Sequence, residues 1–158
     1  MDAITLLKND HKAAARLFRE FERAGPTTDR QSVVDSIIET LSVHTAIEEG
    51  VFYPAARREA SETLADVFEG LEEHHVVKWL LLELSELDPS DDRFNAKTKV
   101  VIEFVRHHVE EEETEFFPKL RKALGRKRLL ELGAELEAAK VTAPGFPQVS
   151  AKMSPQGR

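Results

Sequence analysis

Two stretches of the sequence combine a histidine with a glutamate four residues later, followed by two bulky residues and a proline. The first, HTAIEEGVFYP, runs from His44 to Pro54, and the second, HVEEEETEFFP, runs from His108 to Pro118. Residues four apart lie on one face of an α-helix, so both side chains of each pair can reach the same ion. Imidazole and carboxylate ligands together suit iron, although the spacing alone also allows manganese or zinc. The two stretches therefore predict a metal site with one glutamate, Glu48 or Glu112, from each copy.

Two further histidines extend the repeat. The stretch DHKAAARLF around His11 resembles EHHVVKWLL around His74. His11 lies 33 residues before His44, and His74 lies 34 residues before His108. The chain thus contains two related halves, and each half offers two imidazoles and one carboxylate.

The remaining polar residues near these motifs have a less direct relation to the site. His75 and His107 each neighbour a motif histidine and lie about 100° away from it around a helix. We therefore expect them around the site or on the surface. In the run EEEET at residues 110–114, only Glu112 is expected to point inward.

Four long segments have helical periodicity and are separated by turn signals. They are expected at about residues 2–24, from a cap at Thr28 or Asp29 to about residue 58, from Ser61 to the break at Pro89, and from Ser90 or Asp91 to Gly125. These four segments form the expected bundle domain, residues 1–125. A short helix at residues 126–140 and a disordered tail at 141–158, rich in Pro, Gly and Ser, are expected to follow.

A histidine occupies the apolar seam of every long segment. Apolar residues recur at alternating intervals of three and four in each, and the seam also includes Leu64 and Glu115. Short connections favour an all-α fold, an up-down-up-down antiparallel four-helix bundle. In that fold the four histidines point into one central volume, with apolar side chains above and below.

A buried polar cluster without a metal is the alternative interpretation, because a lone buried histidine is more often hydrogen-bonded than bound to an ion. Four histidines at one level, with two glutamates, are harder to explain in that way. Each glutamate buried without a cation would cost several kcal/mol or would have to be protonated. The pattern therefore favours a metal.

Composition narrows the function further. The chain has 158 residues, a net charge of -7 and no cysteine, which excludes disulfides, zinc-thiolate sites and iron-sulfur clusters. It has no apolar run near the roughly 20 residues of a membrane span, and its N-terminus has no signal-peptide pattern, so we expect a cytoplasmic protein. The acidic charge argues against nucleic acid as the main partner.

In combination and order, four stretches resemble the hemerythrin-like, or HHE cation-binding, family: DHKAAARLF, HTAIEEGVFYP, EEHHVVKWLL and HHVEEEETEFFP. The resemblance covers about residues 4–122. It implies two non-haem iron ions, bridged by oxide or hydroxide, that interact with dioxygen, hydrogen peroxide or nitric oxide. It assigns the ligands as His11, His44, Glu48, His74, His108 and Glu112, with both glutamates bridging.

The chain departs from the oxygen-carrying members of that family at Lys78, where those members have a second histidine on the third helix. The lost ligand leads us to expect reaction with small oxidants, most of all peroxide, in place of reversible oxygen carriage. The alternatives are a non-catalytic protein that binds or senses oxygen, iron or nitric oxide, and a metal-free bundle. Lys78 itself either neutralises a bridging carboxylate, donates a proton to peroxide or extends toward solvent.

Tyr53 is the only tyrosine, and Phe117 is its counterpart in the second copy. A phenolate suits ferric iron, so Tyr53 is a candidate for the missing ligand. An ideal helix, however, places Tyr53 about 180° from His44. It reaches inward only if the helix is wound differently before Pro54, for example by a π-bulge. Otherwise Tyr53 is expected to pack at the end of the bundle.

Overall fold

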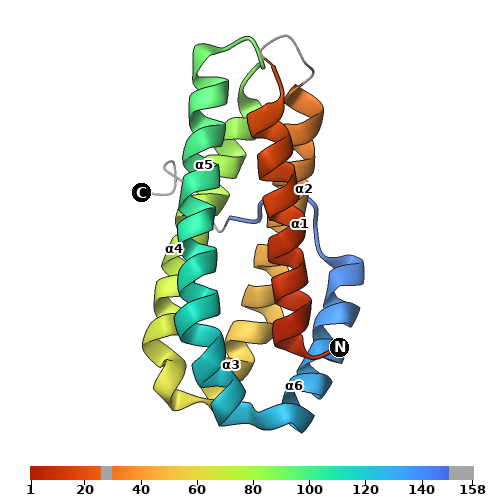
Figure 1. Ribbon diagram of the computed structural model, residues 1–158, viewed down its shortest axis with the longest axis vertical. Helices are drawn as coiled ribbons and strands as arrows, with labels where there is room; N and C mark the ends of the chain where they lie inside the picture. The colour runs from red at the N-terminus through yellow and green to blue at the C-terminus, as the bar shows by residue number, and fades with distance from the viewer. Residues whose placement is uncertain (26–29, 150–158) are drawn as a thin grey trace.

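Four long antiparallel helices dominate the computed structural model, which describes residues 1–25 and 30–149 (Figure 1). They are α1 (Ala3–Arg23), α2 (Arg30–Ile47), α4 (Leu64–Glu86) and α5 (Asp92–Glu111). The described residues contain no strand, and none of their helices is long and apolar enough to cross a membrane. The expected all-α, up-down-up-down bundle is confirmed.

Side chains cap two of the long helices. The carboxylate of Asp2 accepts a hydrogen bond from the backbone N–H of Thr5 at the start of α1, at 2.8 Å. Asp91, one of the two predicted caps of the fourth helix, accepts from the N–H of Arg93 at 2.8 Å. These bonds satisfy N–H groups that the first turn of a helix leaves unpaired. The predicted caps Thr28 and Asp29 lie outside the described residues.

Each copy of the repeated motif contains one π-helical segment. The segments are η1 (Glu48–Phe52), which leads from α2 into α3 (Tyr53–Glu59), and η3 (Glu112–Phe116), which leads from α5 into α6 (Phe117–Thr142). The backbone N–H after each segment, from Tyr53 or Phe117, donates to the carbonyl five residues earlier. Such wide turns are rare and concentrate at functional sites. Here they change which side chains face the bundle interior.

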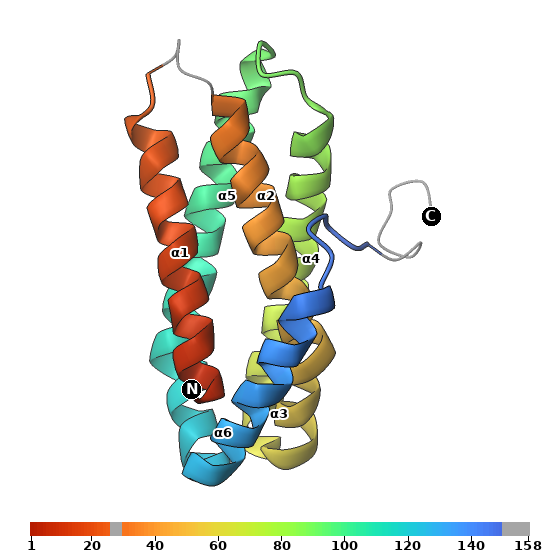
Figure 2. The same cartoon turned by 90° about the vertical axis from the view of Figure 1, so that its right-hand side faces the viewer.

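A fifth helical segment covers one side of the bundle. After the 3-10 turn η2 (Ser61–Thr63) and helices α4 and α5, the chain turns within α6 at Gly125, whose φ is 74°. Gly125 is the residue predicted to end the fourth long helix. Beyond it, α6 runs back across α1 and α2 (Figure 2) and buries three leucines, Leu129, Leu132 and Leu136.

Apolar residues form two clusters, one at each end of the bundle, and a layer of buried polar residues separates them. The two clusters correspond to the apolar seam predicted above and below the histidines. The prediction was wrong for two positions of the seam. Leu64 begins α4 at the end of the bundle and is 40% exposed. Glu115 lies in η3, where the wide turn leaves it on the surface.

Candidate metal centre

One imidazole from each long helix enters the polar layer. His11 comes from α1, His44 from α2, His74 from α4 and His108 from α5, and none is more than 7% exposed. The rings pair within each half of the chain: the centroids of His11 and His44 lie 4.9 Å apart, and those of His74 and His108 lie 5.0 Å apart. The structure thus brings the four predicted histidines into one layer, as two pairs.

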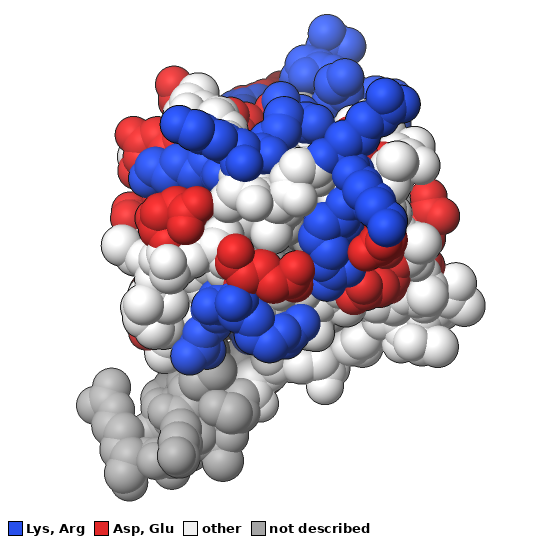
Figure 3. All heavy atoms as spheres, turned by 90° about the horizontal axis from the view of Figure 1, so that it is seen from below, with Lys and Arg blue, Asp and Glu red and all other residues white. Residues whose placement is uncertain are grey.

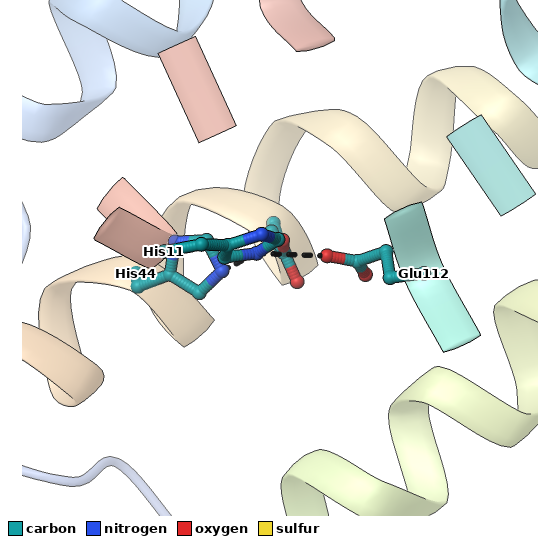
Figure 4. Close-up of side chains that lie close together, drawn as sticks. His11, His44 and Glu112 are labelled. Atoms are coloured by element: carbon teal, nitrogen blue, oxygen red, sulfur yellow. Dashed lines mark ion pairs between the residues drawn. The ribbon is translucent and has the colours of Figure 1, made fainter. Parts of the chain in front are cut away.

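The glutamates that open the π segments join these two pairs. The two carboxylate oxygens of Glu48 lie 2.8 Å from Nε2 of His44 and 3.0 Å from Nε2 of His74. Those of Glu112 lie 3.2 Å from Nε2 of His11 and 3.6 Å from Nε2 of His108. Figure 4 shows His11 and His44 facing Glu112. Each glutamate therefore spans both halves, which is the geometry that a bridging carboxylate requires.

The donor atoms form groups that could hold metal. Oxygens or nitrogens within 4.8 Å of one another form two groups that share Glu48: His11, His44, Glu48 and Glu112 in the first, and Glu48, His74 and His108 in the second. Six of these buried atoms make ion-pair contacts but no hydrogen bond among the described residues: Nε2 of His11, His44 and His108, both oxygens of Glu48, and Oε1 of Glu112. Buried polar atoms without a hydrogen bond are rare in folded proteins. Metal ions would satisfy them.

In each of the four central histidines, a carboxylate contacts the other ring nitrogen, Nδ1. The Nδ1 contacts are His11 with Glu113 at 2.8 Å, His44 with Asp10 at 3.3 Å, His74 with Glu49 at 3.0 Å and His108 with Glu73 at 2.8 Å. A carboxylate on Nδ1 fixes the ring orientation, so that Nε2 faces the centre and becomes a stronger donor. The four partners also follow the repeat, since Asp10 corresponds to Glu73 and Glu49 to Glu113.

Sequence reasoning missed these four carboxylates. It was wrong for Glu113, which was expected on the solvated face of the acidic run but bonds His11 from η3. A signal was present: an acidic residue directly precedes His11 and His74, and a second glutamate directly follows Glu48 and Glu112.

Two lysines pair with these outer carboxylates. Nζ of Lys78 lies 2.8 Å from Oε1 of Glu49, and Lys140 of α6 bonds Asp10. Lys78 is 6% exposed, so the expectation that it extends into solvent is wrong. Nor does it pair with a bridging candidate. It neutralises Glu49 because both side chains lie beside His74 at the edge of the polar layer.

The cluster shifts the protonation of its members. Burial alone would lower the pKa of His44, but Glu48 and Asp10 outweigh it and raise that pKa to about 10. In the same way Glu48 and Glu49 raise the pKa of His74 to about 9, although burial opposes them. Burial would raise the pKa of Glu48, but His44 and His74 hold it well below its usual range. Without a metal, the site is a network of ion pairs.

Tyr53 reaches the centre. It is 1% exposed, and its hydroxyl donates to Oε2 of Glu112 at 2.9 Å and lies 3.2 Å from Nε2 of His74. The segment η1 rotates it inward, so the expectation that it packs at the end of the bundle is wrong. Burial and the charges of Glu112 and Glu48 raise the pKa of the phenol well above its usual value. Its role as a ligand stays a prediction.

A glycine makes room for this phenol. A Cβ atom added at Gly70 of α4 would lie 2.7 Å from the Tyr53 hydroxyl, closer than carbon and oxygen atoms approach without a bond. The corresponding position in the first half is Leu7, and there Phe117 stacks on His11 with ring centroids 5.9 Å apart. Tyr53 and Gly70 therefore break the two-fold symmetry together.

The other two histidines do not enter the centre. The side chains of His75 and His107 are 37% and 63% exposed. His107 lies 3.0 Å from Glu111, and His75 lies 3.7 Å from Glu72. Both lie at the surface, one of the two locations that the sequence predicted for them.

Comparison with known proteins shows the family and the fold of this chain. The model of the hemerythrin HHE cation-binding domain matches residues 2–120. A crystal structure of a hemerythrin HHE cation binding domain-containing protein from Mycobacterium kansasii, described as an Rv2633c homolog, has the same fold. It is 23% identical in sequence, with a TM-score of 0.74 over all of this chain and 95% of that one.

A curated relative from Nostoc sp. (strain PCC 7120 / SAG 25.82 / UTEX 2576) is named DNA nickase. It is 27% identical over 140 residues, which are 89% of this chain. The chain spans 39% of the length of that relative.

Proposed function

Because this chain belongs to the hemerythrin HHE cation-binding family, we propose that it holds two non-haem iron ions and reacts with small oxidants, consuming hydrogen peroxide. His11 and His44 would hold one ion, and His74 and His108 the other. Glu48 and Glu112 would bridge them, since each glutamate already spans both pairs. Tyr53 would complete the second half, where its hydroxyl lies beside His74.

The chain also offers space for a small oxidant. A small cavity adjoins all four histidines, and the rest of its lining is largely apolar, with Leu41, Val77 and Val105. Small molecules with little charge, such as dioxygen, nitric oxide and hydrogen peroxide, suit such a lining. The cavity thus supports access from the apolar side of the polar layer.

Disproportionation of peroxide needs no partner beyond the centre. One molecule of hydrogen peroxide is reduced to two of water, while a second is oxidised to dioxygen and gives up the two protons and two electrons that the first consumes. When bound, an iron pair supplies two one-electron couples for this exchange. The protein would hold the pair in its buried polar layer, and Glu49, paired with Lys78, would orient His74.

The observation that carries the proposal is the position of Lys78. It turns to Glu49, 2.8 Å away, and so supplies no ligand where oxygen carriers have a second histidine. The second half then has two imidazoles, and a phenol stands beside them in place of a third. A centre short of nitrogen ligands is suited to binding and converting peroxide rather than to reversible oxygenation.

Oxygen evolution from peroxide tests this proposal. Iron-loaded protein should release dioxygen rapidly from added peroxide, and metal-free protein should not. Metal analysis of the same samples should give about two irons per chain, as the two donor groups require. A stable, reversible oxy-spectrum through repeated oxygenation would contradict it. Iron binding without peroxide turnover would instead favour the non-catalytic binding or sensing role.

Contact with DNA is a second candidate, favoured by one surface of the molecule. Residues 116–130 include six Lys and Arg and no Asp or Glu. This segment begins α6 at the lower end of the bundle, and Figure 3 shows Lys and Arg gathered over that end. A basic surface of this kind binds phosphates. The relative named DNA nickase makes nucleic acid the polyanion to test.

Fluorescence anisotropy with a labelled DNA duplex distinguishes this candidate. Substituting the exposed Lys122, Arg126 and Lys127 with Gln should weaken binding and reduce its salt dependence. The matched control substitutes Arg16, Arg19 and Lys99, which are also exposed but lie toward the other end of the bundle. Equal affinity of both variants, or no binding by the unmodified chain, would leave the expectation of no nucleic-acid partner standing.

A further inference from the structure

A second opening to the metal centre is lined by carboxylates. It lies between α4 and the α5–η3 segment. Five acidic residues form its walls: Asp66, Glu69, Glu73, Glu111 and Glu115. We call it the acidic opening. Its chemistry is opposite to that of the apolar cavity on the other side of the polar layer.

Candidate ligand atoms without a hydrogen bond lie at the inner end of the acidic opening. His108 and Glu112 line it, although they are only 6% and 3% exposed. Nε2 of His108 and Oε1 of Glu112 have no hydrogen-bond partner among the described residues. The opening therefore connects surface carboxylates with two buried atoms that make ion-pair contacts but no hydrogen bond and that suit a cation.

In the first half of the repeat, the described residues at the corresponding positions are apolar. The repeat aligns Asp66 and Glu69 with Ala3 and Leu6, and Glu111 with Ile47. All three of these counterparts are apolar and at most 5% exposed. They belong to the apolar cluster that α6 covers. Carboxylates thus replace apolar residues only in the half that α6 leaves uncovered.

Negative charge in the opening is only partly balanced. At the rim, Lys119 pairs with Asp66 at 3.0 Å. Elsewhere in the wall, the exposed Glu69 lies near Glu111, whose charge raises the pKa of the Glu69 carboxyl. One oxygen or nitrogen from each of Glu73, Glu111 and the adjacent His107 falls within 4.8 Å of the others, close enough to contact one cation. The surroundings attract a positive ion toward the inner end.

We propose that the acidic opening is the port through which a divalent metal ion reaches the centre. The inference rests on the proposed function only in requiring that the centre binds metal. Clefts lined by charge of one sign concentrate counter-ions and raise association rates by about 10- to 1,000-fold. The port serves the second half, and the ion destined for the first half passes the shared glutamates.

The rate of metal uptake tests the port. Metal-free full-length chain is mixed rapidly with cobalt(II), whose visible absorption reports binding. The port variant is Glu69→Gln/Glu115→Gln, both exposed wall residues. The control is Glu20→Gln/Glu86→Gln, equally exposed residues at the far end of the bundle. At low salt the port variant should take up metal about five-fold more slowly than unmodified protein, with the same final stoichiometry.

The outcomes separate the two proposals. The difference between the port variant and the unmodified chain should shrink at high salt, because salt screens exposed charges. Equal uptake rates for the port variant and the control would overturn the port while leaving the metal centre intact. Failure of the unmodified chain to bind cobalt(II) or iron(II) at all would overturn both proposals.

Discussion

The hydroxyl of Tyr53 lies 3.2 Å from Nε2 of His74, although an ideal helix would point it away from the histidines. The π turn η1 produces this contact, and the missing side chain of Gly70 gives it space. The two copies of the repeat differ most clearly here. At the equivalent place beside the first pair of histidines, Phe117 of the second copy stacks on His11.

Tyr53→Phe should leave the bundle and its iron content in place but remove a visible absorption band from phenolate to iron. The reason is that the phenol oxygen is the only tyrosine oxygen in the chain and lies beside the ligands. Optical spectra of iron-loaded unmodified protein and variant, at equal iron content, check it. An unchanged spectrum would exclude Tyr53 from the metal.

Gly70→Ala should destabilise the protein by about 1–3 kcal/mol, because the new methyl group overlaps the Tyr53 hydroxyl. Helix propensity alone would favour alanine by about 1 kcal/mol. A net loss of stability would therefore indicate the overlap with the Tyr53 hydroxyl. Urea unfolding of the metal-free chain measures the effect. The same substitution in a Tyr53→Phe background should cost less, and an equal cost in both backgrounds would argue against the contact.

Glu48→Gln and Glu112→Gln should each lower the number of irons bound per chain, because each carboxylate faces both histidine pairs. An amide is a weaker ligand and cannot bridge with two anionic oxygens. Metal analysis after equilibration with iron(II) provides the measurement. The control is Glu72→Gln, since the Glu72 side chain is 82% exposed. Full iron content in both variants would refute the bridging assignment.

Asp10→Asn and Glu73→Gln should weaken metal binding without abolishing it, by about 10- to 100-fold, because each orients one ligand histidine. The two residues occupy equivalent places in the repeat, so their effects should be similar. Competition titrations with a metal-binding dye give the affinities. Unchanged affinity in both variants would mean that packing alone orients His44 and His108.

Metal-free protein should lose stability as the pH rises from about 6.5 toward 9 to 10. The pKa of His44 is raised to about 10 and that of His74 to about 9. Both exceed the unfolded value of about 6.5, so the folded chain binds more protons than the unfolded chain across this window. The stabilisation from His44 and His74 is therefore complete below about pH 6.5 and is lost as the pH rises toward 9 to 10.

Urea unfolding with a chelator, at several pH values, tests this direction. In iron-loaded protein the free energy of unfolding should depend less on pH, because the metal replaces the protons on Nε2 of the histidines. A metal-free stability that increases across the window would contradict the assignment of protonated histidines.

Sequence reasoning predicted the fold and the relation between the halves, because both rest on periodicity. Seam spacing placed His11, His44, His74 and His108 at one level, and the Glu at the fourth following position identified Glu48 and Glu112. Regular helical geometry is sufficient for those side chains, since each histidine lies within a regular α-helix and each glutamate begins a π segment.

Beyond these positions regular geometry fails. A wide turn shifts everything after Glu48 and Glu112, so the inward turn of Tyr53 and the contact of Glu113 with His11 could not follow from an ideal helix. The contacts of Lys78 with Glu49 and of Lys140 with Asp10 depend on which helices lie side by side. A sequence repeat does not specify the neighbours of each helix. Gly70 was the clearest sequence feature that the prediction did not use. The repeat aligns this glycine with a leucine in the other half, which indicates extra space beside it.

The bond between Lys140 and Asp10 bears on how this unit can be moved between proteins. Asp10 contacts Nδ1 of His44 and is itself paired with Lys140. Lys140 lies 20 residues beyond the end of the family match at residue 120. A graft cut at that point would keep all six candidate His and Glu ligands but leave behind a counter-charge that supports one of them. The smallest transferable module therefore includes α6, and a fusion junction belongs after Thr142.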